Sequence, residues 1–162
     1  MSARKKAGRV DYWRDADAPR PTSRKPSASV IVRNSRGELL LLRRPDSGRW
    51  TIPTGGLKKN ETLRQCAMRE CREETGLDVE LTGLVGVFSD PSHVIAYANG
   101  EVRQPVNACF SARWIGGKLT ATDEATDVAW VPAKKLDDYD IHPSIRRRIA
   151  HGLEYNGVPH VD

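Results

Sequence analysis

Three glutamates, Glu70, Glu73 and Glu74, fall within one stretch of five residues. On an α-helix, residues four apart share a face, so Glu70 and Glu74 would lie together with Glu73 beside them. Carboxylates that close repel one another unless a cation neutralises them. Because hard divalent cations such as Mg²⁺ or Mn²⁺ prefer oxygen ligands, this cluster is typical of a metal site.

A glycine-containing segment, residues 53–57, precedes the cluster and would let the backbone approach a ligand closely. Its carbonyl oxygens could complete an octahedral cation shell, while the N-terminus of the following helix offers a positive dipole. Arg69 can reach Glu73 one turn away or fold toward Glu61, which would hold the carboxylates in register. These parts together favour the attack of metal-activated water on a phosphate.

The acidic cluster also has a purely structural interpretation. The pattern Arg-Glu-x-x-Glu-Glu on a helix is usually a solvated face with ion pairs. The glycine segment, Glu61 and the terminal Gly76-Leu77 around the cluster favour the metal site instead.

A helix from Thr62 to Thr75 is predicted to carry the cluster. Thr62 and Gln65 can form a capping box at its start, and Gly76 is a suitable residue just after its end. A second helix is predicted from His142-Pro143 to about Leu153, because proline is favoured in a first turn.

Short apolar runs between turn residues predict the strands around these helices. Asn99-Gly100 between two of the runs is typical of a type I′ hairpin, and a second hairpin is predicted around residues 34–37. The runs cover residues 28–32, 39–42, 81–88, 94–98, 102–114 and 128–131.

The composition predicts one folded domain. Hydrophobic residues make up 38% and charged residues 29% of the 162 residues, which excludes a wholly disordered chain and a membrane protein. The longest aliphatic run, residues 39–42, is far shorter than the ~20 residues of a membrane-spanning helix.

Residues 1–27 are predicted to be a basic extension, partly ordered by the aromatic residues near Trp13, and residues 28–162 a single α/β domain. The net charge of +5 suits phosphate-bearing partners without identifying one.

The cysteines Cys66, Cys71 and Cys109 match no zinc-binding spacing and are predicted to be small buried side chains. No apolar segment follows the basic start as in a secretory signal, so a cytoplasmic location is expected.

The segment from Gly55 to Leu77 resembles the signature of the Nudix hydrolase family. The family pattern is Gly-x5-Glu-x7-Arg-Glu-U-x-Glu-Glu-x-Gly-U, where U is aliphatic. All fixed positions match except the first U. Cys71 stands at the first U, Lys58 where many members carry Glu, and Asn60 where many carry Gly. Since asparagine tolerates the left-handed conformation, the turn at Asn60 is expected to survive.

The resemblance implies a fold, a reaction and roles for particular residues. The fold is a Nudix-type α/β/α sandwich around a mixed β-sheet with a loop–helix–loop catalytic box. The reaction is hydrolysis of a pyrophosphate bond in a nucleoside diphosphate linked to another moiety, with Mg²⁺ or Mn²⁺. The implied metal ligands are Glu70, Glu73, Glu74 and the Gly55 carbonyl, with Arg69 and Glu61 orienting them. The general base is expected among the box glutamates or at Glu124. The alternative interpretation of Glu124 is a solvated acidic residue in a turn.

Candidate substrate-binding residues lie outside and beside the box: Arg43, Arg44, Lys58, His93 and Tyr97. Arg43 and Arg44 should point to opposite faces, so at most one meets the phosphates. Residues 146–148, three arginines on the terminal helix, are expected to be solvated, with a nucleic-acid surface as the alternative.

Several functions remain open at this point. Pro91 lies about fifteen residues past the box, and this position resembles that of a proline in the ADP-ribose-hydrolysing branch of the family. ADP-ribose or nucleotide-sugar substrates are therefore favoured over nucleoside triphosphates or a 5′ RNA end. A nucleotide- or RNA-binding module without catalysis, and an interaction protein whose basic tail contacts nucleic acid, are the non-enzyme alternatives. No membrane and no obligatory nucleic acid is expected as a partner, and the resemblance allows a homodimer.

Overall fold

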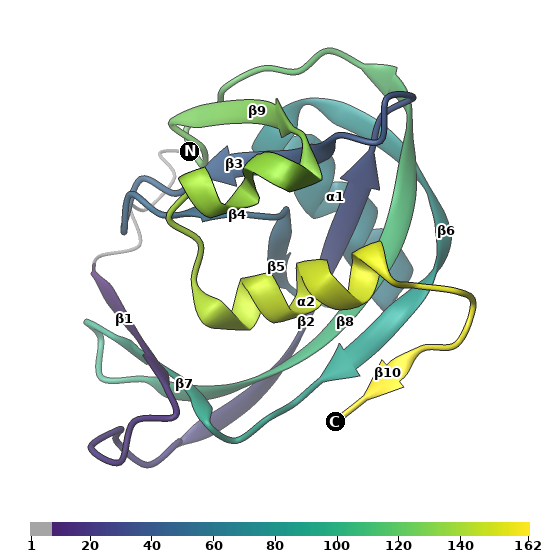
Figure 1. Cartoon of the computed structure of the whole chain (residues 1–162). Coiled ribbons are helices and arrows are strands. Elements are labelled where there is room, and N and C mark those ends of the chain that lie inside the picture. Colours follow the sequence, from purple (N-terminus) through teal and green to yellow (C-terminus); the bar gives the residue numbers. More distant parts are fainter. Residues whose placement is uncertain (1–7) are drawn as a thin grey trace.

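The strands in the computed structural model, which describes residues 8–162, follow the apolar runs of the sequence and extend beyond several of them (Figure 1). The first seven residues of the expected basic extension lie outside the described residues. The elements are β1 Arg9–Trp13, β2 Ser23–Arg33, β3 Leu39–Arg43, β4 Trp50–Thr51, β5 Thr54–Gly56, α1 Leu63–Thr75, β6 Leu77–Phe88, β7 His93–Tyr97, β8 Val102–Gly117, β9 Asp127–Val131, a 3₁₀ helix Ala133–Asp138, α2 Pro143–Leu153 and β10 His160–Val161.

The ten strands form one curled, mixed sheet. Along its main path the order is β1-β7-β8-β2-β3-β4, and β5, β6 and β9 add to β2, β8 and β3. The β2–β8 and β10–β6 pairs are parallel, and the others are antiparallel. The predicted α/β class with a mixed sheet is therefore confirmed.

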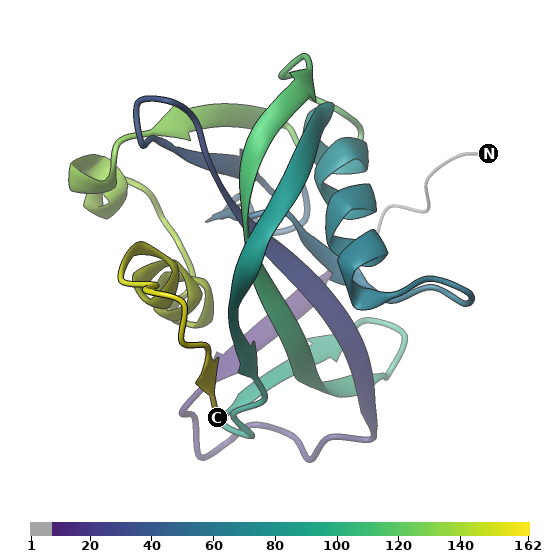
Figure 2. The ribbon, with the colours of Figure 1, turned by 90° about the vertical axis from the view of Figure 1, so that its right-hand side faces the viewer.

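Alternation along the central strands builds a core on each face of the sheet. Val30 and Val32 of β2 point to the side of α1, whereas Ile31 points to the side of α2. In β3, Leu40 joins the first core and its neighbours join the second, as period-two side-chain alternation requires. The two helices consequently cover opposite faces, with α1 and α2 on either side of the sheet in Figure 2, and the expected sandwich is confirmed.

Both predicted hairpins form, but one turn differs from the expected type. β2 and β3 pair antiparallel around residues 34–37, and β7 and β8 pair antiparallel around Asn99-Gly100. Gly100 has a positive φ of 88°, but Asn99 does not have a positive φ. A type I′ turn needs positive φ at both central residues. The connection is a longer loop, closed by the Tyr97 N–H donating to the Glu101 carbonyl at 2.8 Å.

The segment before residue 28 contributes two strands to the sheet. β1 pairs antiparallel with β7, from Arg9 opposite Tyr97 to Trp13 opposite His93. β2 begins at Ser23, five residues before the apolar run that predicted it. This placement brings polar residues of β1 and β2, among them Arg9, Asp11 and Lys25, to a pocket that residues of α2 also line.

The three cysteines are free and buried, as predicted. Burial raises the pKa of the Cys66 thiol to about 11 and that of Cys71 to about 12, which makes both thiols poor nucleophiles. Among residues 8–162, no helix has the length and apolar character needed to cross a membrane.

Candidate active site

Helix α1 presents two of its three glutamates to the interior. Thr62 and Gln65 form the predicted capping box, and Gly76 ends the helix with a left-handed φ of 79°. Between these ends, Glu70 is 9% exposed and Glu74 is 6% exposed. Glu73 is exposed, because the one-residue step from Glu74 turns it away from the sheet.

The glycine segment lies directly against these two buried acids. β5 pairs with β2, which places Gly55 opposite Ala28 and turns its Cα toward α1. A Cβ at position 55 would overlap the carboxylate of Glu70, so a larger residue would have to displace that side chain. The backbone N–H of Thr54 donates to Glu74 Oε1 at 3.4 Å. The segment that was expected to approach a ligand therefore shapes the acidic site.

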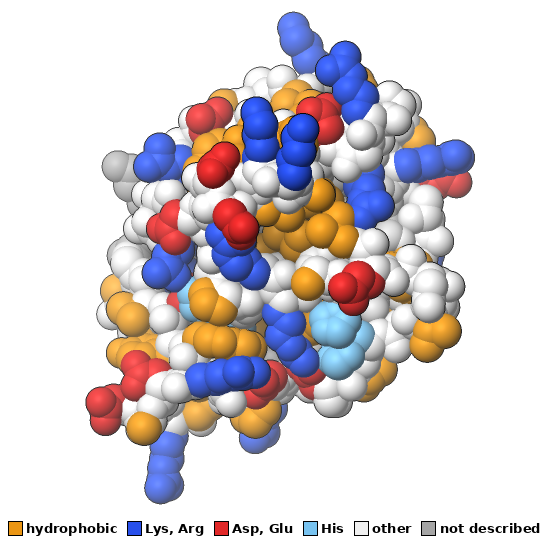
Figure 3. Space-filling view, in the orientation of Figure 1, with side chains coloured by type: hydrophobic (Ala, Val, Ile, Leu, Met, Phe, Trp, Pro, Cys, Tyr) orange, Lys and Arg blue, Asp and Glu red, His pale blue; other side chains and the backbone are white. Residues whose placement is uncertain are grey.

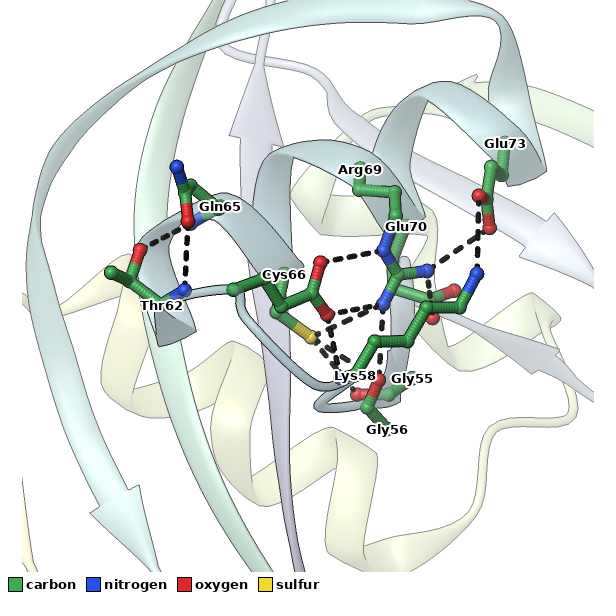
Figure 4. Close-up of polar contacts among 10 residues, drawn as sticks. Gly55, Gly56, Lys58, Thr62, Gln65, Cys66, Arg69, Glu70 and Glu73 are labelled. Atoms are coloured by element: carbon green, nitrogen blue, oxygen red, sulfur yellow. Dashed lines mark hydrogen bonds and ion pairs between the residues drawn. The ribbon is translucent and has the colours of Figure 1, made fainter.

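Arg69 joins the loop to the helix (Figure 4). Its Nε and Nη2 donate to the two oxygens of Glu61 at 2.8 and 2.6 Å, and Nη1 donates to Glu70 Oε1 at 2.8 Å. Nη2 also donates to the Gly56 carbonyl at 3.0 Å. The Arg69 contact holds the pKa of Glu61 at about 2, so Glu61 stays ionised and anchors the guanidinium. Both orientations expected for Arg69, toward Glu61 and toward the helix acids, occur at once.

A loop after β8 brings a third carboxylate to the buried pair. One carboxylate oxygen from each of Glu70, Glu74 and Glu124 lies within 4.8 Å of the others. The Thr122 hydroxyl donates to the Glu74 carbonyl oxygen at 3.3 Å, which fixes the loop against α1. Glu124 is exposed, in contrast to its two neighbours, so it lies at the mouth of the group.

The chemistry of this group fits a divalent cation. Burial, followed by the neighbouring carboxyl of Glu70, raises the pKa of Glu74 well above its ordinary value, with a smaller opposing effect from Arg44. When both are ionised, Glu70 and Glu74, with oxygens within 4.8 Å of each other, carry more negative charge than Arg69 offsets, because Arg69 also pairs with Glu61. A cation with oxygen ligands would remove this imbalance.

Glu73 and Lys58 lie beside the group rather than in it. Glu73 Oε2 accepts from Arg69 Nη1 at 3.1 Å, and its other oxygen lies 3.8 Å from Lys58 Nζ. The Lys58 backbone N–H donates to Glu61 at 2.8 Å, and Asn60 adopts the expected left-handed conformation with a φ of 62°. The turn thus holds Glu61 in place for Arg69.

A pocket extends from β5 across the sheet toward α2 and contains three of the five candidate substrate-binding residues. Arg44, His93 and Tyr97 line it together with Thr54, Gly55 and Gly56. Arg43 points elsewhere, with Nε donating to the Gly48 carbonyl at 2.9 Å, so one of the two adjacent arginines faces the pocket as expected. His93 is buried, with Nε2 3.1 Å from Asp11 Oδ1.

The pocket also contains residues that the sequence analysis missed, among them Asp11, His142 and Arg148. Arg148 was expected to be solvated with its neighbours, and this is wrong: it is 5% exposed. It lies three residues after Ile145 and one before Ile149, on the buried face of α2. That helical spacing could have predicted the burial of Arg148 from the sequence. No local sequence pattern could have predicted that β1 pairs with β7, which brings Asp11 to the pocket.

Comparison with known proteins agrees with this geometry. The family model described as NUDIX domain matches residues 23–152. A MutT-like protein of Streptomyces ambofaciens is 33% identical over 111 residues, which cover 68% of this chain and 65% of that protein, just under two thirds of its length. A nucleoside triphosphatase NudI of Enterobacter sp. is 29% identical over 123 residues, covering 72% of this chain and 87% of the relative.

Among solved structures, a NUDIX hydrolase from Nitrosomonas europaea has a TM-score of 0.69 at 18% identity, with 85% of this chain and 93% of that chain covered. At that identity the likeness concerns the fold. The family match spans most of the chain and contains the complete box, so the protein belongs to the Nudix family and is a pyrophosphohydrolase. Members of this family act on nucleotide-type small molecules.

Proposed function

We propose that this protein hydrolyses a pyrophosphate bond in a nucleoside diphosphate linked to another moiety, using Mg²⁺ or Mn²⁺. The observation that carries the proposal is the convergence of Glu70, Glu74 and Glu124 within 4.8 Å beside the glycine segment. In the proposal, Glu70, Glu74 and the Gly55 carbonyl hold the metal, and Glu73, which pairs with Arg69 and Lys58 beside the group, is a further ligand. When bound, a divalent cation supplies neutralisation of phosphate oxygens and lowers the pKa of a water.

The protein residues position the reactants around that cation. Arg69 holds Glu70 through one nitrogen and is itself anchored by Glu61, so the Glu70 carboxylate cannot rotate toward solvent. Glu124 is our candidate for the general base, because it is the exposed member of the group and can accept a proton from a water beside Glu70 and Glu74. Thr54 orients Glu74 by donating its N–H to it.

Charge in the pocket favours phosphate-rich substrates over nucleotide sugars. Among residues 8–162, six lysine and arginine side chains and one carboxylate, that of Asp11, line it. Three further carboxylates, which pair with four of the six from outside the lining, leave the pocket with a net positive charge. Pro91, which pointed to ADP-ribose, is exposed and is not among the lining residues. We therefore place nucleoside triphosphates or a 5′ triphosphate RNA end ahead of ADP-ribose. The relative named as a nucleoside triphosphatase supports this order.

The test is a panel of nucleoside triphosphates, a 5′ triphosphate oligoribonucleotide, ADP-ribose, nucleotide sugars and dinucleoside polyphosphates. Each is incubated with Mg²⁺, with Mn²⁺ or with EDTA, and the products are separated by chromatography. We expect cation-dependent release of a nucleoside monophosphate and pyrophosphate from a triphosphate. Nucleotide binding by calorimetry without product in any metal would instead support a binding module. Product formed equally in EDTA would contradict the proposed metal site.

A further inference from the structure

Arg148 is buried at the end of the pocket opposite the acidic box. It belongs to α2, which covers the face of the sheet away from α1 (Figure 1), and it lines the pocket with His93 and His142. The same pocket reaches Gly55 and Gly56 of the catalytic loop. A ligand extending from the metal site along this pocket would therefore meet Arg148.

Carboxylates pair with the other lysine and arginine side chains of the pocket. Figure 3 shows acidic and basic side chains interspersed over one face of the molecule. Arg9 pairs with Asp11 at 2.8 Å and Arg44 with Asp46 at 2.7 Å. The remaining pairs are Lys25 and Arg103 with Glu101, and Arg49 with Asp140. Each of these five side chains thus has a carboxylate partner within the protein, although Lys25 and Arg103 share Glu101.

Arg148 has no such partner among residues 8–162. No carboxylate lies within ion-pair range of its guanidinium, and its Nε is buried without a hydrogen bond. Its guanidinium lies over the ring of Phe88, whose centroid is 6.0 Å from Arg148 Cζ. Burial lowers the pKa of Arg148 to about 10, so it is still charged at neutral pH. A buried charge without a partner is costly to the fold, and an anion would offset that cost.

We propose that Arg148 binds a phosphate group of the substrate, other than the two that flank the hydrolysed bond. This inference rests on the proposed function, because the pocket that contains Arg148 begins at the catalytic loop. The planar guanidinium suits phosphate, since it can donate two parallel hydrogen bonds to neighbouring oxygens. The substrate class is consequently a nucleotide with at least three phosphates.

A cation at this end of the pocket fits less well, although Asp11, His93 and His142 have ligand atoms within 4.8 Å of one another. Arg9 donates to both oxygens of Asp11, at 2.9 and 2.8 Å. The positive charges of Arg9 and Arg148 both act on His93, where burial already lowers the pKa of the imidazole. A divalent ion would face both guanidinium groups, whereas a phosphate would be attracted to them.

The first test measures phosphate binding without catalysis. Thermal unfolding is followed in EDTA with increasing inorganic phosphate for the wild type, Arg148→Met and the control Arg113→Met. Arg113 is an exposed residue of β8 that pairs with Glu80 at 2.6 Å and does not line the pocket. We expect phosphate to raise the Tm of the wild type and of Arg113→Met but not of Arg148→Met. Without phosphate, Arg148→Met should be at least as stable as the wild type, because it removes a buried charge.

An equal response of Arg148→Met and the wild type, or no response of the wild type, would overturn the proposal. If Arg148→Met does not fold, Arg148→Lys keeps the charge and loses the paired donors, and it should show a weaker phosphate response.

The second test compares KM for ATP and ADP-ribose with Mg²⁺. Loss of a charged hydrogen bond should raise KM for ATP by about 10- to 100-fold in Arg148→Met and leave KM for ADP-ribose unchanged. Equal changes in KM for both compounds would contradict the assignment of Arg148. If the wild type turns over none of the compounds, the proposed function is contradicted. In that case the phosphate titration still decides whether Arg148 binds phosphate.

Discussion

The Cα of Gly55 lies so close to the carboxylate of Glu70 that any larger residue at position 55 would displace that carboxylate. Glu70 is also held by Arg69 on its other side. The glycine therefore sets the position of a proposed metal ligand by steric contact, in addition to the ligand role proposed for its own carbonyl.

The first prediction concerns this contact. Gly55→Ala should displace the Glu70 carboxylate, weaken Mn²⁺ binding by about 10- to 100-fold and lower kcat by ~10²-fold or more. Gly116→Ala is the control, because a Cβ there would meet only ordinary contacts with Asp78. Metal affinity by paramagnetic resonance of Mn²⁺ and steady-state kinetics provide the measurements. Normal Mn²⁺ affinity in a folded Gly55→Ala protein would argue against Glu70 as a ligand.

The second prediction uses the raised pKa of Glu74. Because the folded state holds this proton more tightly than the unfolded state, whose Glu pKa is near 4.5, the stability of the metal-free protein should fall as pH rises above that value. Glu74→Gln cannot ionise, so in EDTA its gain in Tm over the wild type should be larger at pH 8 than at pH 5. Turnover with Mg²⁺ should fall ~10²- to 10³-fold. Unchanged turnover at saturating Mg²⁺ would refute the site.

The third prediction concerns the anchoring of Arg69. Arg69→Lys cannot reproduce the paired donors to Glu61, so the pKa of Glu61 should rise from about 2 toward its ordinary value. Turnover should fall by about 10- to 100-fold as Glu70 loses its support. Arg72→Ala serves as the control, because Arg72 is exposed on the same helix and pairs with Asp78. Carboxyl carbon NMR titration measures the pKa, and an unshifted Glu61 would contradict the proposed support.

The fourth prediction tests where the folded domain begins. A chain that starts at Ser23 lacks β1, and a chain that starts at Ala28 also lacks the first five residues of β2. We expect each truncation to lower Tm, the shorter chain by more than ~4 °C beyond the longer one, which corresponds to over about 1 kcal/mol at this size. Equal Tm values for the full chain and the chain from Ala28 would support residues 28–162 as the complete folding unit.

Local sequence rules predicted the acidic helix well because each of its features depends on near neighbours. The capping box, the left-handed Gly76 and the shared face of Glu70 and Glu74 all follow from spacings of four residues or fewer. The contact of Arg69 with Glu73 has the same four-residue spacing, whereas its paired contact with Glu61, eight residues away, depends on the loop before the helix. Such short-range relationships survive folding because helix geometry alone fixes them.

The far end of the pocket depends on contacts that no local pattern reveals. Asp11 meets His93 only because β1 pairs with β7, and these residues are 82 positions apart in the chain. Arg148 was misjudged for a different reason, since a run of three arginines was taken as one solvated group. Only two of the three can face solvent when Ile145 and Ile149 turn the helix toward the sheet.

The loop that carries Glu124 is fastened to its surroundings at three points. The Thr120 N–H donates to the Thr75 carbonyl at 2.9 Å, Thr122 reaches the Glu74 carbonyl, and the Thr126 N–H donates to the Arg43 carbonyl at 3.0 Å. An insertion or deletion between these anchors would shift the third carboxylate relative to the other two. Lineages that acquire new substrates are therefore expected to keep the length of this loop and to vary the edge formed by β1 and β7, where added residues leave the acids in place.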